Sequence, residues 1–219
     1  MAEKQPRTVV ETAYYEGTKD VQALLYSDGT ILVNHVRASY PHFGKPYEAT
    51  NDDGKKSEKW SMKGMMPKET HKPAMRLMKK HMEQMMKDNK VSDLASDRKY
   101  LRNGDDLGKE EMKGMFVFSA SETDPIKVRS ASAAKMTDPA EIDRLFYGGC
   151  WVNALIRPWW QNHAKYGKRV NSGLSAVQFF KDDEPFGEGR IDDETVDDTF
   201  APVEGSESGF DDDDDLDDL

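Results

Sequence analysis

Runs of branched and alternating apolar residues predict about five principal β-strands in this chain. They cover residues 31–38, 59–66, 114–120, 150–157 and 174–180, and a shorter strand is expected at 126–129. Short helices interrupt the series, but strands and helices do not alternate in regular units. The pattern therefore predicts a mainly β protein with an antiparallel barrel or sandwich rather than a parallel sheet.

Two helices are predicted between the strands. Met75, Met78, Met82 and Met85 recur at helical spacing after Pro73, which suits a first helical turn. We interpret this stripe as core packing rather than a partner groove, because Met fills irregular gaps. A second helix is expected after Asp138, because Asp at the N-cap followed by Pro is typical of a helix start.

Two loops are expected to display aromatic and basic side chains. Pro41 lacks the amide donor of a central strand, so residues 40–47 are interpreted as a loop after the first strand. Residues 165–169, Lys-Tyr-Gly-Lys-Arg, are interpreted as a second loop of the same kind.

Charge divides the chain into two parts. Residues 1–180 carry a net charge of +6, whereas residues 181–219 carry −16, out of −10 for all 219 residues. A segment of such charge buries little apolar surface, so we predict a body at residues 1–181 and a disordered acidic tail at 182–219. A basic body with an acidic tail favours a body that binds polyanions.

The composition argues against several classes of protein. No apolar run approaches the roughly 18 residues of a membrane span, and the first residues lack the apolar core of a signal peptide. Cys150 is the only cysteine, so an internal disulfide and a multi-cysteine metal site are excluded, and a cytoplasmic setting is expected.

Enzyme motifs are also missing from the sequence. The five histidines lack metal-site spacing, and neither a phosphate-binding P-loop nor a nucleophile elbow is present. Cys150 is expected to be a buried, inert thiol, and Asp105-Asp106 is the one internal acidic pair worth testing as a metal site. We therefore expect no enzyme activity, no cofactor and no metal.

The strand that begins at Cys150 holds the most informative pattern. Val152, Ala154 and Ile156 form one face, while the other mixes aromatic, amide and cationic residues. Interleaved rings and cations are what a single-stranded nucleic-acid surface requires, since bases stack on rings and cations neutralise phosphates. The predicted contacts, from this strand, the two loops and neighbouring strands, are Arg37, Tyr40, Phe43, Lys45, Tyr47, Lys59, Lys63, Trp151, Asn153, Arg157, Trp159, Trp160, Tyr166, Lys168 and Arg169.

The order of several segments resembles the phage-encoded single-stranded DNA-binding proteins of the OB-fold type. The segments are 36–43, 59–68, 100–108, 114–121, 146–154 and 173–180, followed by an acidic tail. The resemblance implies an OB-fold-like antiparallel five-stranded barrel that coats single strands in phage replication or recombination without catalysis, in the infected host cell. This chain departs from the pattern in its Met-rich helix and at Arg157-Pro158-Trp159-Trp160, where we expect Pro158 to end or bend the strand.

The acidic tail is expected to compete with DNA for the basic surface and to recruit replication or recombination partners. Its end offers acidic and apolar groups together: Phe210, Asp211, Asp212, Asp213, Asp214, Asp215, Leu216, Asp217, Asp218 and Leu219. Two alternatives remain open, an acidic interaction protein or DNA mimic and a metal-dependent nuclease.

Overall fold

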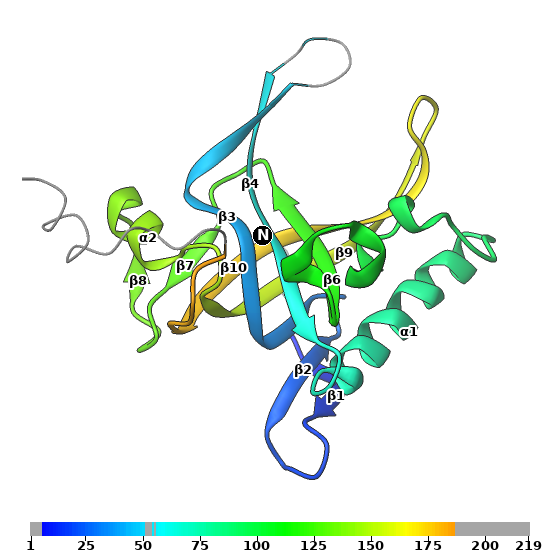
Figure 1. The fold of residues 1–219 in the computed structure, drawn as a ribbon. Helices are drawn as coiled ribbons and strands as arrows, with labels where there is room; N and C mark the ends of the chain where they lie inside the picture. The colour runs from blue at the N-terminus through cyan, green and yellow to red at the C-terminus, as the bar shows by residue number, and fades with distance from the viewer. Residues whose placement is uncertain (1–5, 51–53, 55, 187–219) are drawn as a thin grey trace, which may run out of the picture. The chain divides into compact units, whose positions relative to one another are not determined.

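The computed structural model describes residues 6–50, 54 and 56–186 (Figure 1). The tail residues 210–219 that the sequence analysis singled out lie outside the described residues. No helix in the described ranges is long and apolar enough to cross a membrane.

Ten strands of the described chain join one open sheet, so a mainly β fold is confirmed but a closed five-stranded barrel is not. The order is β5-β6-β4-β3-β9-β10-β7-β8, and β2 lies off this path, paired with both β1 and β3. The strands are β1 (Val9–Tyr14), β2 (Val21–Tyr26), β3 (Ile31–Thr50), β4 (Lys56–Pro67), β5 (Leu101–Asn103), β6 (Met115–Glu122), β7 (Lys127–Arg129), β8 (Lys135–Met136), β9 (Trp151–His163) and β10 (Gly167–Lys181). Pairing is antiparallel between these strands except for β10 with β7.

Two long hairpins extend from the sheet as arms, as Figure 1 shows for β3–β4 and β9–β10. The prediction that Pro41 ends the first strand is wrong, because β3 continues from Ile31 to Thr50. Its pairing with β4 is irregular between Ser39 and His42 and again before Tyr47, so the strand absorbs Pro41 and Pro46 where the ladder is interrupted.

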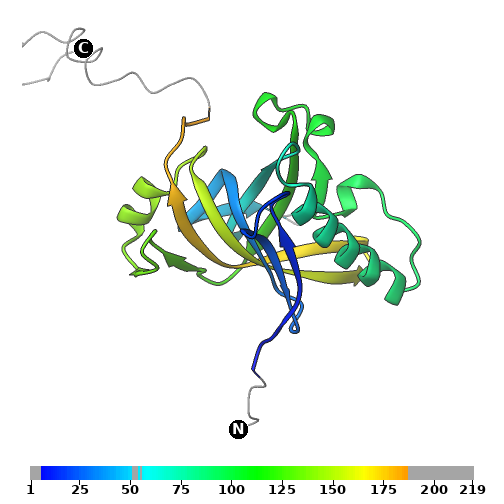
Figure 2. The same ribbon diagram turned by 90° about the horizontal axis from the view of Figure 1, so that it is seen from below.

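The helix α1 (Lys72–Asp88) packs one face onto the sheet, and the expected Met stripe is confirmed as core. Met78, Met82 and Met86 are buried, and Met75 and Met85 are partly buried against the same core. Figure 2 shows α1 along one side of the strands and α2 (Pro139–Leu145) at the opposite end. The side chain of Asp138 accepts a hydrogen bond from the Ala140 amide, which confirms it as the N-cap of α2.

A bulge in β3 reverses the expected faces of that strand. His35 has φ 53°, and the pairing of β3 with β9 shifts between Val33 and Val36. The extra residue turns Val36 and Ala38 into the core together with Ile31 and Val33. Simple alternation along a regular strand would place these two pairs on opposite faces, but the bulge adds one residue to the count and brings them to the same face.

Residues 182–186, which the sequence assigned to the tail, lie against the body. The Phe186 amide donates to the Gly148 carbonyl at 2.8 Å, and an added Cβ at Gly149 would lie 2.4 Å from the Glu184 carbonyl oxygen. The compact unit that ends at Phe186 therefore extends five residues past the predicted boundary at residue 181.

Candidate nucleic-acid interface

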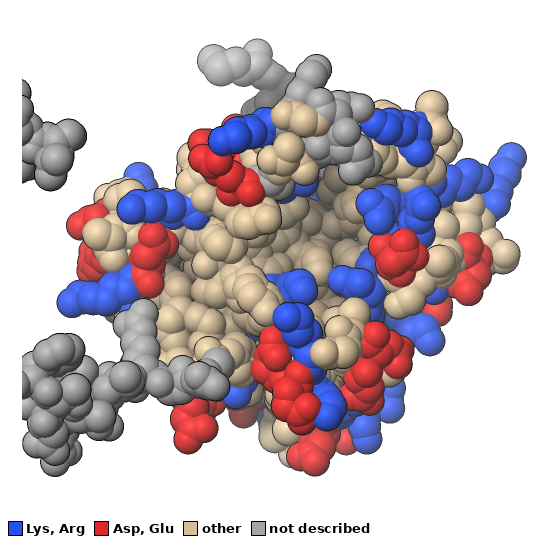
Figure 3. Space-filling view, turned by 45° about the horizontal axis from the view of Figure 1, so that its top comes forward, with Lys and Arg blue, Asp and Glu red and all other residues tan. Residues whose placement is uncertain are grey.

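A groove of about 930 Å³ runs between the two hairpin arms. It is lined by β3, β4, β6, β9, β10 and the segment 97–102, together with Lys109. The space-filling view shows a hollowed surface with Lys and Arg side chains, interspersed with acidic ones, around it (Figure 3). We call this surface the central groove.

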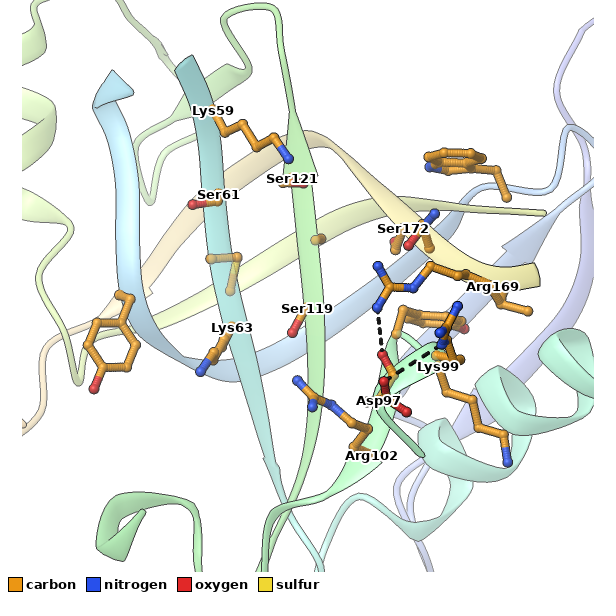
Figure 4. A pocket seen from close by; sticks show the side chains of 18 of the residues that line it. Lys59, Ser61, Lys63, Asp97, Lys99, Arg102, Ser119, Ser121, Arg169 and Ser172 are labelled. Atoms are coloured by element: carbon orange, nitrogen blue, oxygen red, sulfur yellow. Dashed lines mark hydrogen bonds and ion pairs between the residues drawn. The ribbon is translucent and has the colours of Figure 1, made fainter. Parts of the chain in front are cut away.

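One side of the central groove is formed by β4 and β6. Lys59, Ser61 and Lys63 face the groove, while Gly64 lies against the Phe118 ring in the core. Ser61 pairs with Ser121, and Lys63 pairs with Ser119, so hydroxyl and ammonium groups share one face of the two strands (Figure 4). Lys59 and Lys63 were predicted contacts, and both face the groove because alternate side chains of a strand point to the same side.

Tyr40 projects from β3 at the edge of the central groove with half of its surface exposed. It has φ 49°, a left-handed conformation that is unfavourable for a bulky residue and that clusters at functional sites. The Lys63 and Lys109 ammonium groups lie 5.2 and 5.8 Å from the centre of its ring. This arrangement holds an exposed ring between two cations.

Tyr47 lines the central groove further along the β3 arm. Its ring centre lies 5.3 Å from that of His42, and Tyr47 is 53% exposed. Burial lowers the pKa of His42, so a neutral imidazole lies beside the tyrosine at neutral pH. Both rings are accessible for stacking.

The opposite side of the central groove is formed by β9 and β10. Trp159, 45% exposed, is paired with Asn171, and Gln161 is paired with Arg169. Of the two outcomes expected for Pro158, an end or a bend of the strand, the first is wrong, because β9 continues to His163 with Pro158 paired to Ser172. Among the described pairings, β3 accompanies β9 only as far as Ile156, so Pro158 lies where a strand tolerates the loss of an amide donor.

The segment 97–102 links the two sides and was not identified from the sequence. Arg169 donates to the Asp97 carbonyl at 3.2 Å, and Arg98 donates to the Tyr166 carbonyl. Lys99 binds the Asp93 carboxylate at 2.6 Å. The Arg169 and Arg98 contacts tie the segment to the β9–β10 arm, and an irregular polar stretch carries no periodic signal that could have revealed it.

Arg102 and Lys109 are two further groove residues that sequence reasoning missed. Arg102 is on β5, which pairs with β6 through Arg102 and Val117. Its Nε atom is buried and has no hydrogen-bond partner in the described part of the chain. Both residues lie outside the strands and helices predicted from the sequence, and only the fold brings them to the groove.

Six of the predicted contacts come together in the central groove, and the others do not line it. The six are Tyr40, Tyr47, Lys59, Lys63, Trp159 and Arg169. Phe43 is a correction, because it is buried in the core with its ring against Phe146 and does not belong to a displayed loop. The interrupted pairing of β3 turns this ring inward, although Tyr40, Lys45 and Tyr47 of the same segment are exposed.

Arg37 and Trp151 form a separate cluster with the docked segment 182–186. The Trp151 Nε1 atom donates to the Asp183 carboxylate at 2.5 Å, and Arg37 donates to the Glu184 carbonyl at 2.7 Å. The Arg37 guanidinium also lies 4.4 Å from the centre of the Phe186 ring. These groups hold a segment of the chain itself.

Asn153 and Arg157 also have partners outside the central groove. Asn153 accepts from the His35 amide at 3.0 Å, which holds the β3 bulge in place. The Arg157 guanidinium lies 3.6 Å from the Asp28 carboxylate. Asn153, Arg157 and Trp159 lie on the same face of β9, which suggested a common surface. The strand is long, however, and the first two residues contact other parts of the fold than the groove.

The remaining predicted contacts lie on the arms. Trp160 is half-buried and packs against the core, and Tyr166 stacks on His163 at a centroid distance of 4.9 Å. Lys168, near the tip of the β9–β10 arm, and Lys45, on β3, are exposed.

The groups considered for catalysis have structural roles. Burial raises the pKa of the Cys150 thiol to about 12, so the reactive thiolate is disfavoured. The Asp105 carboxylate binds Lys68 and accepts from the Gly114 amide at 2.7 Å, and the Lys68 contact lowers its pKa. Within the described ranges, no cluster of three potential metal-binding His, Cys, Asp or Glu side chains is found.

Comparison with known proteins places this geometry in a family. No protein among the curated ones matches the chain. The chain is 37% identical to the single-stranded DNA-binding protein of bacteriophage Enc34 solved in complex with ssDNA, with a TM-score of 0.69 over 81% of this chain and 99% of that one. A second structure of that protein gives 37% identity and a TM-score of 0.68 over 85% of this chain and 99% of that one. A structure of its C-terminal truncation gives 38% identity and a TM-score of 0.69 over 82% of this chain and 100% of that one.

The sequence model of one family, described as Enterobacter phage Enc34, ssDNA-binding protein, matches residues 29–216. That range includes both arms, the central groove and most of the acidic tail. The chain therefore belongs to the Enc34 ssDNA-binding protein family.

Proposed function

We propose that this protein binds single-stranded DNA in the central groove by base stacking and phosphate neutralisation, with little sequence preference. The observation that carries the proposal is the exposure of Tyr40, Tyr47 and Trp159 around a groove that also presents lysine and arginine side chains. Each stacked base contributes about 1–3 kcal/mol, and this contribution tolerates any sequence because every base has a π-face. A homologous phage protein of 37% identity has been solved in complex with ssDNA, which supports the same ligand class for this chain.

Titration with oligo-dT at several salt concentrations tests the proposal through tryptophan fluorescence. Trp159 is partly exposed in the central groove, so stacking on its indole is expected to quench the emission. Affinity is expected to fall with salt by about 0.7 log units per neutralised phosphate for each log unit of salt. If tryptophan fluorescence does not change when oligo-dT is added, at any salt concentration, the result would instead favour an acidic interaction protein or DNA mimic.

We propose binding without catalysis, during phage replication or recombination. The support is that Cys150 is buried with a raised pKa and that Asp105 is engaged by Lys68 and the Gly114 amide, which leaves neither poised to react. Incubating labelled single strands with magnesium or manganese tests this: intact strands are expected, and cleavage would establish a nuclease.

The acidic tail is proposed to compete with DNA for the cationic groove and to bind a replication or recombination partner when DNA frees it. Its charge of −16 over residues 181–219 is opposite to that of the body. A flexible tether gives an effective concentration of roughly millimolar. Truncation after Phe186 keeps the docked segment 182–186 and is expected to tighten DNA binding, most strongly at low salt.

A matched control for the truncation replaces the aspartates of 211–218 with asparagine at full length. The competitor role predicts that this variant shifts DNA affinity in the same direction as the truncation but by less, because seven of the tail's negative charges are removed and the chain is kept. Unchanged or weaker DNA affinity in both proteins would discard the competitor role and leave the DNA-binding proposal intact.

A further inference from the structure

The cations of the central groove fall into two sets. On the side of the β9–β10 arm they are already engaged: Arg98 and Arg169 bind backbone carbonyls, and Lys99 binds Asp93. On the side of β4, β5 and β6, Lys59 and Arg102 pair with no carboxylate of the described chain. An anion that enters the groove therefore finds uncommitted positive charge along one side.

Arg102 differs from the lysines on that side. Its Nε atom is buried without an acceptor in the described part of the chain, and a buried unpaired donor costs free energy. Its guanidinium belongs to a side chain that lines the groove, beside Lys63 and Ser119 in Figure 4. The buried Nε atom itself is closed to a ligand, but the two terminal nitrogens of the guanidinium can donate two hydrogen bonds to one phosphate.

The neighbours of Arg102 suit a sugar–phosphate backbone. Ser61, Ser119 and Ser121 lie on the same face of β4 and β6, and their short side chains let a strand approach the sheet closely while offering hydroxyl donors. Exposed Trp159 lies on the opposite side, where the cations are engaged. The groove thus separates groups that suit phosphates from a ring that suits a base.

We propose that the phosphate backbone of bound single-stranded DNA follows the β4–β5–β6 side of the central groove, and that Arg102 holds one phosphate as a fixed bidentate contact. Lys59 and Lys63 add charge along the same side without fixing a position, because an ammonium group is a flexible point charge. The inference rests on the proposed function and assigns the path of the ligand within the same site.

The test compares oligo-dT affinity across salt concentrations for Arg102→Gln, Arg102→Lys, Arg169→Gln and the unsubstituted protein. Arg102→Gln is expected to weaken binding at least about tenfold and to reduce the salt slope by about 0.7. Arg102→Lys is expected to restore the slope but not the affinity, since it keeps the charge and loses the fork. Arg169→Gln is expected to change the slope less, because its guanidinium already donates to the backbone carbonyl of Asp97.

The control is Arg144→Gln, which also removes one positive charge, at an exposed position on α2 outside the groove. Thermal unfolding shows whether each variant is folded, and Arg102→Lys carries the test if Arg102→Gln is not. An unchanged slope in Arg102→Gln, or a larger slope change in Arg169→Gln, would overturn the assigned path. Full recovery of affinity by Arg102→Lys would overturn the bidentate contact, whereas lack of oligo-dT binding by the unsubstituted protein contradicts the proposed function itself.

Discussion

The Trp151 indole holds the Asp183 carboxylate, with 2.5 Å between Nε1 and Oδ2. The same carboxylate lies 3.6 Å from the Arg37 Nε atom, so one acidic side chain joins β9, β3 and the segment that leaves β10. The two predicted DNA contacts in this cluster therefore hold the start of the tail.

Asp183→Ala is expected to release the docked segment. The hydrogen bond from Trp151, followed by that from the Glu184 amide, lowers the pKa of Asp183 below its ordinary value of 3.8. A depressed pKa in the folded protein means that the contact stabilises docking above pH 3.8 and is lost as the pH falls through the folded value. Hydrogen exchange at the Phe186 amide, which donates to the Gly148 carbonyl, is expected to become faster in the variant at neutral pH. Equal protection in both proteins would contradict this role.

Trp159→Ala is expected to weaken DNA binding by about 1–3 kcal/mol, the contribution of one stacked base. Phe180→Ala is the matched control, because Phe180 is 40% exposed against 45% for Trp159 and does not line the groove. Oligo-dT affinity by fluorescence anisotropy measures both. Equal losses in the two variants would show that the groove is not the stacking site.

Gly64→Ala is expected to destabilise the fold by about 1–3 kcal/mol through overpacking. A Cβ at this position would lie 2.1 Å from the Phe118 ring, which fills the core behind β4. Ser61→Ala on the groove face of the same strand is the control, with a change within about 0.5 kcal/mol. Urea unfolding distinguishes them, and a neutral Gly64→Ala would show that the ring moves without cost.

Cys150 is expected to resist alkylation in the folded protein and to react after unfolding. Burial raises the pKa of its thiol from 9.0 to about 12. Between pH 9 and 12 the folded protein therefore retains a proton that the unfolded chain releases, so stability falls as the pH rises through this range. Iodoacetamide labelling at pH 8, with and without urea, tests the first statement. Unfolding at pH 8 and pH 10 tests the second, with Cys150→Ala expected to reduce the pH dependence.

Local patterns predicted the elements in which one physical signal dominates. The Met stripe of α1 and the Asp138 cap of α2 depend on residues close in sequence, and the structure confirms both. The lysines of β4 were placed correctly because an uninterrupted strand alternates strictly. The family resemblance added an expected function, single-stranded DNA binding. The family-model match to residues 29–216 and the similarity to the Enc34 structures confirm the family.

The local patterns failed at positions where pairing between strands distant in sequence determines the structure. Asn153 accepts from the His35 amide, and the resulting bulge turns Val36 and Ala38 inward against simple alternation. Pro158 stays within β9 because one edge of the strand is unpaired there, a condition that the dipeptide itself does not carry.

By itself, the sequence determined the mainly β class, the division of charge and the residue types that suit single-stranded DNA, because these follow from composition and short-range periodicity. Only the tertiary structure decided which of those residues share a surface. It placed Trp159 and Tyr40 around one groove and added Arg102 from the short strand β5, while it turned Phe43 into the core and set Trp151 against Asp183. The reason is that a binding surface is formed by strands distant in sequence, and a bulge, a bend or a docked segment redirects a side chain without changing its local pattern.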